Sequence, residues 1–193
     1  FVTPAGGLGE IVEAVAARLA PQGVRLGAAV AGVRRGGAGW EVLLAGGGVM
    51  PARAVILATP AFEAAGTVAA LDPALSAELA GIPFVSVATV SVAFPAGAVP
   101  HRLPGYGYVT PRAEGGDVVA CTVTSNKFPS RVPGSAVLLR FFLGRAGREA
   151  VAAAEDEVLR GLVRDEMARV FRLTAEPAEW RVVRWARGMP QYA

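Results

Sequence analysis

The sequence predicts a mixed α/β chain of the α+β kind, with two parts that differ in their pattern of apolar residues. Up to about residue 80, a helical pattern precedes short strand patterns and a continuous aliphatic run at 54–58. Beyond about residue 81, long runs of β-branched residues alternate with Gly, Pro and charged turns, which is typical of an antiparallel sheet. A boundary between the two parts is therefore predicted near residues 78–83.

The first part is expected to combine helices and strands. Apolar residues recur at helical spacing from Leu8 to Leu19. The stretch "VRLGAAVAGVRR" predicts a strand, and the turn "GGAG" leads into a second strand, "WEVLLA". The aliphatic segment 54–58 predicts a further strand that is buried on both faces. Helical patterns follow it, and Asp72 stands where the cap of the second one is expected.

The second part is expected to form a sheet with one long helix. Its strand patterns are "FVSVATVSVAF", "GYGYVTP", "DVVACTVTS" and "SAVLLRFFLG". Apolar residues at helical spacing then predict a helix over about 148–171. In that helix Asp165 and Arg169 stand four residues apart, which favours an ion pair. A final strand is predicted from Trp180 to Trp185.

The composition allows a sizeable core and argues against several classes of protein. Hydrophobic residues make up 53% of the 193 residues and charged residues 18%, which is typical of a folded chain. The net charge is +3, and the arginines are scattered rather than gathered in a stripe, so no nucleic-acid partner is expected. No apolar run is long enough for a transmembrane helix. The single cysteine, Cys121, cannot form an internal disulfide, which is consistent with a reducing cytoplasm.

Side chains that commonly carry catalysis are scarce. His101 is the only histidine, which excludes a metal site built on two His and leaves a surface loop as its expected place. Cys121 stands in the middle of a predicted strand and is interpreted as a small core residue. The turn "GGLGE" lacks the glycine spacing of a dinucleotide-binding motif, and no paired-carboxylate pattern is present. No catalytic side chain and no metal site are therefore nominated, and a cofactor is expected to supply any chemistry.

Several stretches, taken in order, resemble the flavin-containing amine-oxidase superfamily. They are "GGLGEIVEAVAARL", "VRLGAAVAGVRR", "GWEVLL" and "ARAVILATP". The later stretches "LPGYGYVTPR", "ACTVTSNKFPSRVP", "VLLRFFLGRAG" and "RWARGMPQY" closely resemble bacterial protoporphyrinogen and coproporphyrinogen oxidases. The resemblance implies FAD as the cofactor. It also implies an internal piece of a longer enzyme, without the N-terminal dinucleotide fingerprint and the C-terminal FAD segment of the family.

The resemblance also implies a division into domains. Residues 1–80 correspond to part of a Rossmann-like FAD-binding domain, 81–179 to a mainly antiparallel substrate-binding domain with a helix, and 180–193 to a return into the FAD-binding domain. Cofactor contacts are implied for Val30, Thr59 and Trp185. The residues implied to line the tetrapyrrole cavity are Tyr106, Gly107, Val109 and Phe142. A propionate contact is further considered for Lys127 or Arg131.

The implied activity is oxidation of a porphyrinogen, either coproporphyrinogen III or protoporphyrinogen IX, to the porphyrin in heme biosynthesis. In three two-electron rounds FAD would accept hydride, and O₂ would reoxidise the flavin. Further implied partners are a peripheral membrane contact and a ferrochelatase that receives the product. Two alternatives stay open: another member of the superfamily, such as an amine oxidase or carotenoid desaturase, and an inactive, stand-alone β-rich binding module.

Overall fold

The computed structural model describes residues 2–37, 39–100 and 103–192, so His101 lies outside the described residues. The chain forms two compact units. The large unit comprises the N-terminal residues up to Glu13 and the segment Phe84–Pro190, and the small unit comprises Ala14–Pro83 and the residues from Gln191 onward. The units meet in sequence between Pro83 and Phe84, next to the predicted change of pattern.

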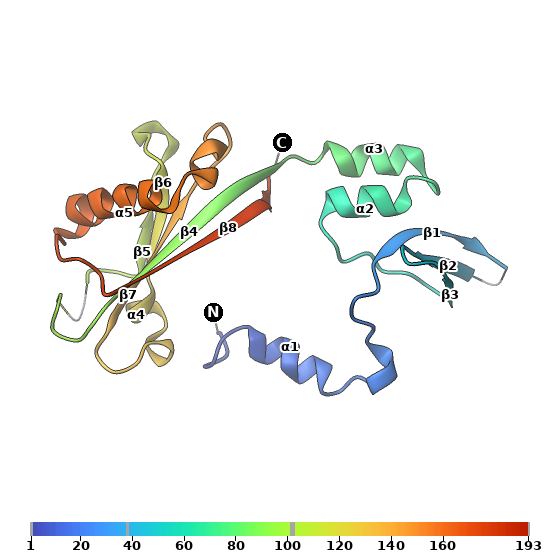
Figure 1. Ribbon diagram of the computed structural model, residues 1–193, viewed down its shortest axis with the longest axis horizontal. Coiled ribbons are helices and arrows are strands. Elements are labelled where there is room, and N and C mark those ends of the chain that lie inside the picture. Colours follow the sequence, from blue (N-terminus) through green and yellow to red (C-terminus); the bar gives the residue numbers. More distant parts are fainter. Residues whose placement is uncertain (1, 38, 101–102, 193) are drawn as a thin grey trace. The chain divides into compact units, whose positions relative to one another are not determined.

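The small unit joins a three-stranded antiparallel meander to a pair of helices (Figure 1). Its strands are β1 (Val30–Gly36), β2 (Gly39–Leu44) and β3 (Val49–Ala52), in that spatial order. Its helices are η1 (Pro21–Gly23), α2 (Ala61–Val68) and α3 (Pro73–Gly81), and α1 (Gly9–Ala16) precedes them. Asp72 accepts a hydrogen bond from the Leu75 backbone N–H at 2.9 Å, which confirms the predicted cap of α3.

Two strand predictions in this unit are wrong. Residues 54–58 form no strand, and Ile56 is 90% exposed. A strand buried on both faces needs a hydrogen-bonded neighbour on each side, and the part of the chain that the structure describes places none there. The third strand is instead Val49–Ala52, which the glycine turn before it folds back onto β2. The first strand begins only at Val30, because a turn with Gly27 at φ +68° interrupts residues 24–29.

The large unit is built on a five-stranded antiparallel sheet in the order β5-β6-β7-β4-β8. The strands are β4 (Phe84–Phe94), β5 (Gly107–Val109), β6 (Val118–Val123), β7 (Val137–Leu143) and β8 (Glu179–Pro190). Short helical segments join them: η2 (Arg112–Glu114), α4 (Thr124–Lys127), η3 (Pro129–Arg131) and η4 (Glu149–Ala153). The antiparallel sheet predicted for this part is therefore confirmed. The last strand extends beyond Trp185, because it pairs with β4 as far as Pro190 opposite Phe84.

The helix α5 (Asp156–Phe171) covers one face of this sheet (Figure 1). It begins later than predicted, because residues 149–153 form the separate 3-10 segment η4 and Glu155 has an extended backbone. Leu159, Val163 and Met167 point from α5 into the main hydrophobic core. The sheet residues of that core include Val90, Phe141, Leu139 and the predicted core residue Cys121, which is confirmed as buried.

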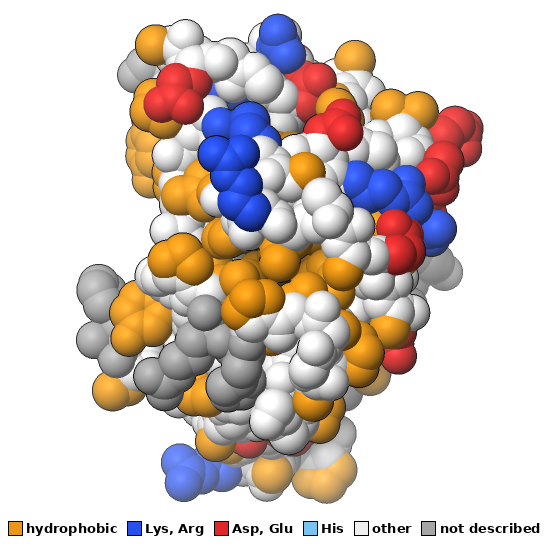
Figure 2. Space-filling view, turned by 90° about the vertical axis from the view of Figure 1, so that its left-hand side faces the viewer, with side chains coloured by type: hydrophobic (Ala, Val, Ile, Leu, Met, Phe, Trp, Pro, Cys, Tyr) orange, Lys and Arg blue, Asp and Glu red, His pale blue; other side chains and the backbone are white. Residues whose placement is uncertain are grey.

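The outer surface of α5 is charged. Arg164 pairs with Glu157 at 2.8 Å and with Glu176 at 3.0 Å. Figure 2 shows Lys and Arg side chains beside Asp and Glu side chains in the upper part of the view, at the height of α5. The predicted partner of Arg169 is wrong: its guanidinium binds Glu166, three residues away, rather than Asp165. No helix among the described residues has the length and apolar character needed to span a bilayer.

Candidate functional site on the open face of the sheet

The two faces of the five-stranded sheet differ because side chains alternate along each strand. The helix face, defined by the residues packed beneath α5, contains the core side chains Val90, Phe141 and Cys121. The open face carries the alternate residues, which are half-buried or exposed except for the buried Val85 and Val87. The buried side chains of α5 lie against the helix face, so the open face is a large surface of this unit that can receive a ligand.

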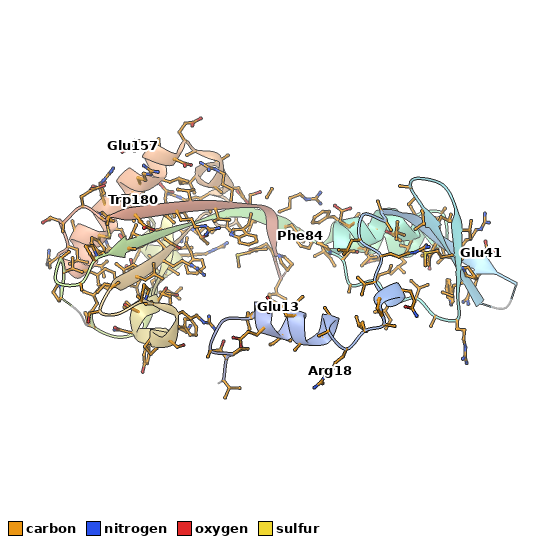
Figure 3. All side chains as sticks on the ribbon, turned by 60° about the horizontal axis from the view of Figure 1, so that its bottom comes forward. Glu13, Arg18, Glu41, Phe84, Glu157 and Trp180 are labelled. Atoms are coloured by element: carbon orange, nitrogen blue, oxygen red, sulfur yellow. The ribbon has the colours of Figure 1, made fainter. Side chains whose placement is uncertain are left out.

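The contacts of Trp180 show which residues of β8 face α5. Its indole Nε1 donates to Glu176 at 3.1 Å, and the guanidinium of Arg164 lies 5.0 Å from its ring centroid. Figure 3 shows Trp180 on the strand near α5, which carries Glu157. Since Trp180 faces α5, the next residue, Arg181, must face the opposite way.

A row that is apolar except for Thr89, named here the apolar row, crosses the open face from one edge of the sheet to the other. Strand register aligns one residue from each strand, and the members in spatial order are Val109, Ala120, Phe142, Thr89 and Val183. Two of the residues that the sequence assigned to a tetrapyrrole cavity, Val109 and Phe142, therefore share one row and one face. Trp185, two residues after Val183, points to the same face.

A polar row lies beside the apolar row. Its members in spatial order are Gly107, Thr122, Arg140, Ser91 and Arg181. The Arg140 Nε donates to the Ser91 hydroxyl oxygen at 3.3 Å, so these two side chains lie on the same face. Arg140 and Arg181 were missed by sequence reasoning. The alternation in "VLLRFFL" and "WRVVRW" could have placed them with Phe142 and Trp185.

The loop that carries Tyr106 borders a pocket of about 480 Å³. The amide Nδ2 of Asn126 donates to the backbone oxygens of Leu103 at 2.6 Å and Gly105 at 2.8 Å. The backbone oxygen of Tyr106 accepts a hydrogen bond from the Val123 N–H at 3.0 Å. The main chain around Tyr106 is thus anchored on both sides, while its side chain stays 69% exposed.

Gly107 is required by the sheet itself. Its φ is +135°, a conformation that side chains disfavour. A Cβ at this position would stand 2.1 Å from the backbone oxygen of Cys121. The sequence assigned the close backbone approach at Gly107 to a ligand. The structure shows a close approach of Gly107 to the backbone of β6, which by itself requires a glycine.

The two cations considered for a propionate differ in their surroundings. The Arg131 guanidinium donates to Thr3 Oγ1 at 2.5 Å and to the Pro4 backbone oxygen at 2.9 Å, and it stacks over Phe128. Its donors therefore hold the N-terminal segment to the large unit. Lys127 is exposed, with its ammonium 5.4 Å from the Phe128 ring centroid. Arg131 keeps a buried Nε donor without a partner, and the ammonium of Lys127 is exposed, so neither cation is excluded as a partner for a propionate.

The predicted flavin contacts are divided between the units. Val30 is the first residue of β1, an edge strand, and edge strands leave main-chain groups accessible. Thr59 is exposed and follows the unpaired segment 54–58. Both belong to the small unit, whereas Trp185 belongs to the large unit and is 53% exposed. The three assignments stay predictions.

A buried network links the helix face to α5. Tyr108 Oη donates to Glu166 Oε1 at 2.6 Å, and Arg169 donates to both carboxylate oxygens of Glu166. Burial raises the pKa of Tyr108, and the hydrogen bond to Glu166 raises it further. Burial also raises the pKa of the Cys121 thiol to about 12, with a contribution from the negative charge of Glu166. Neither Tyr108 nor Cys121 is therefore prepared to lose a proton near neutral pH, and the hydrogen bond from Tyr108 to Glu166 supports β5.

The pKa of Glu166 predicts a pH dependence of stability. Burial alone would raise this pKa, but the hydrogen bonds from Arg169 and Tyr108 outweigh burial and lower it overall. Because the pKa is lowered in the fold, the ionised Glu166 stabilises the fold at pH values above its ordinary pKa of 4.5. This stabilisation is lost as the pH falls below that value. We expect Glu166→Gln to cost about 1–3 kcal/mol at pH 7.

Urea unfolding of the wild type and of Glu166→Gln between pH 7 and pH 3 tests this expectation. The difference between the two unfolding free energies should shrink as the pH falls. Glu157→Gln, at an exposed carboxylate of the same helix, is the control and should cost less than about 1 kcal/mol. A difference that stays constant with pH would contradict the assignment.

Metal chemistry has no support from the described side chains. In the part of the chain that the structure describes, no group of three or more His, Cys, Asp and Glu residues is placed to hold an ion. Ligand-sized features among the described residues include the open face and the pocket beside Tyr106.

The fold is shared with solved oxidase structures. A protein from Exiguobacterium sp. 255-15, described as a candidate protoporphyrinogen oxidase, superposes with a TM-score of 0.81 at 26% identity, covering 98% of this chain and 41% of that one. Cyclohexylamine oxidase from Brevibacterium oxydans IH-35A shares the fold with a TM-score of 0.75 at 16% identity, over 93% of this chain and 39% of that one. The fold is therefore that of the amine-oxidase type.

Residues 2–193 match the family of flavin-containing amine oxidoreductases, and the chain belongs to that family. It is 33% identical over 192 residues to a coproporphyrinogen III oxidase of Bacillus subtilis and 32% identical over 194 residues to one of Propionibacterium freudenreichii. Each alignment covers 100% of this chain but only 40% and 36% of the relatives, so the chain spans about two fifths of their length. The predicted fold class and family are confirmed, as is a flavin as the cofactor of the family.

Proposed function

We propose that this chain forms the central part of an FAD-dependent porphyrinogen oxidase of heme biosynthesis. The observation that carries the proposal is the open face, where Val109, Phe142 and Trp185 lie on one side of a single sheet. A wide, flat and mostly apolar macrocycle needs such a surface. The names of the relatives support the substrate class, and coproporphyrinogen III is favoured over protoporphyrinogen IX because both bacterial relatives described above carry its name.

FAD would supply the hydride acceptor of this oxidation. The proposed contacts are those that the resemblance implies. The edge strand β1 offers main-chain groups at Val30, and Trp185 presents a half-exposed aromatic ring on the open face. Thr59, at the exposed end of segment 54–58, is the third proposed contact. The protein itself would orient the macrocycle against the apolar row and keep water away from it.

O₂ as the final acceptor, a peripheral membrane contact and transfer of the product to a ferrochelatase are parts of the same proposal. The deciding experiment uses a protein in which this chain is completed to the length of its relatives. Each porphyrinogen is added to the FAD-loaded protein in air, and porphyrin fluorescence and H₂O₂ are followed. Oxidation of either porphyrinogen with formation of H₂O₂ is the expected result.

The same assay separates the alternatives. Absence of porphyrin formation, together with bleaching of the flavin by amines, would instead favour an amine oxidase. Bleaching by a carotenoid precursor would favour a desaturase. Failure of the completed protein to bind FAD would favour a binding module without redox activity.

Tyr106→Ala is expected to weaken porphyrinogen binding while FAD remains bound. The side chain of Tyr106 is 69% exposed beside the pocket, and burying an aromatic ring under a ligand is worth about 1.5–3 kcal/mol, or roughly tenfold or more in affinity. The measurement is KM for coproporphyrinogen III, with FAD content read from flavin absorbance. Val158→Ala truncates another exposed side chain, on α5, and is the control. An unchanged KM for Tyr106→Ala would remove Tyr106 from the proposed site.

A further inference from the structure

We propose that Arg140 and Arg181 form a subsite for two carboxylates of the macrocycle, which selects a tetracarboxylate substrate over a dicarboxylate one. The inference rests on the proposed function, because it concerns the same open face. Coproporphyrinogen III carries a propionate on each of its four pyrrole rings, whereas protoporphyrinogen IX carries propionates on only two. Two of the four propionates are therefore shared by both molecules, and a pair of cations that receives the other two would favour coproporphyrinogen III.

The register of the strands places the two arginines in one row. Arg140 of β7 is opposite Ser91 of β4, and Ser91 is opposite Arg181 of β8. With neighbouring strands about 4.8 Å apart, the two arginine Cα atoms are separated by about 10 Å. The hydrogen bond from Arg140 to the Ser91 hydroxyl shows that the Arg140 side chain lies along the open face.

The charges of this pair are not neutralised within the described chain. None of the ion pairs between described residues includes Arg140 or Arg181. Arg184, on the helix face of the same strand, instead forms an ion pair with Asp156 at 2.8 Å. Glu179 is opposite Ala93, two residues before Arg181 on the open face, and it does not form an ion pair with Arg181. Both guanidinium groups are exposed and keep donors for an anion.

The apolar row beside the two arginines indicates that the carboxylates they bind belong to the macrocycle. Phe142 and Val183 follow Arg140 and Arg181 at a spacing of two residues, so an apolar row and a cationic row run side by side. A macrocycle that covers the apolar row brings the carboxylates of its edge to the guanidinium groups. Arginine suits this role because its planar fork binds a carboxylate through two parallel hydrogen bonds. Thr122 and Ser91 add hydroxyl groups to the same row.

The test measures equilibrium binding, so it does not depend on turnover. The protein completed to the length of its relatives and loaded with FAD is titrated with coproporphyrin III, a tetracarboxylate, and with protoporphyrin IX, a dicarboxylate. Porphyrin fluorescence reports binding. We expect the double variant Arg140→Gln/Arg181→Gln to bind coproporphyrin III at least tenfold more weakly, with a change of less than threefold for protoporphyrin IX. The salt dependence of coproporphyrin III binding should fall in the variant, because fewer ion pairs form.

Two variants control the experiment. Arg184→Gln removes one positive charge from the opposite face of β8 and should leave the binding of both porphyrins unchanged. Arg140→Lys/Arg181→Lys keeps the charges and should recover part of the lost coproporphyrin affinity. Thermal unfolding and flavin absorbance of each variant confirm that the fold and the cofactor are retained.

Three outcomes would overturn the subsite. Unchanged coproporphyrin III binding would show that the arginines do not contact the ligand. An equal loss for both porphyrins would show that they do not distinguish carboxylate number. Loss of FAD from the glutamine variant alone would assign the arginines to a flavin phosphate. The glutamine variant could instead bind coproporphyrin III more weakly, as expected, while the wild type oxidises neither porphyrinogen. That result would overturn the proposed oxidation but not the subsite.

Discussion

Phe141→Ala is expected to lower the free energy of unfolding of the large unit by about 3–5 kcal/mol. Phe141 is 0% exposed and lies in the centre of the helix face, opposite Val90 on one side and Cys121 on the other. Truncating it removes the apolar contacts and leaves a cavity that a closely packed sheet and helix can close only in part. Urea unfolding followed by circular dichroism measures the loss.

The neighbouring residue is a matched control for this prediction. Phe142 has the same side chain and is the next residue of the same strand, but it faces the open side, where it is only half-buried. Phe142→Ala should therefore cost less than half as much, because its truncation leaves a notch that water can fill. Equal costs for the two variants would contradict the assignment of the two faces, and with it the proposed site.

Gly107→Ala is expected to detach β5 from the sheet and to abolish the order of the Tyr106 loop. The positive φ of Gly107 alone costs about 1–3 kcal/mol for a residue with a side chain. The added Cβ would also stand 2.1 Å from a backbone oxygen and 2.9 Å from the Cα of Thr122, and backbone atoms cannot move aside without breaking the β5–β6 pairing. The effect should appear as a lower unfolding free energy and as faster hydrogen exchange of the amides in β5 and β6.

Gly161→Ala provides the comparison. Gly161 lies inside α5, where nothing stands within 4 Å of an added Cβ. Because alanine favours a helix over glycine, this variant should be more stable by about 0.5–1 kcal/mol. Unaltered amide hydrogen exchange of β5 in Gly107→Ala would contradict this prediction, because it would show that the strand can accommodate a side chain. The presence of glycine at 107 would then be explained by a ligand.

Local patterns were sufficient for most elements of the large unit. The β-branched run at 84–94 and the apolar run at 137–143 became β4 and β7, and the helical spacing of Leu159, Val163 and Met167 became the buried side of α5. Each of these patterns has a single periodicity that fits one element. Where periodicity was ambiguous the prediction was wrong: segment 54–58 is aliphatic enough for a buried strand but has no strand beside it among the described residues.

The sequence by itself determined the class of fold and most of the segments that become strands and helices, because these depend on composition and on periods of two and 3.6 residues. The family followed from the resemblance of its motifs. The tertiary structure decided which side of each strand faces α5 and which residues from distant strands stand in one row. Val109, Phe142 and Val183 are far apart in sequence and meet only through strand register. The same register places Arg140 two strands from Arg181. Register depends on long-range pairing, which no local pattern encodes.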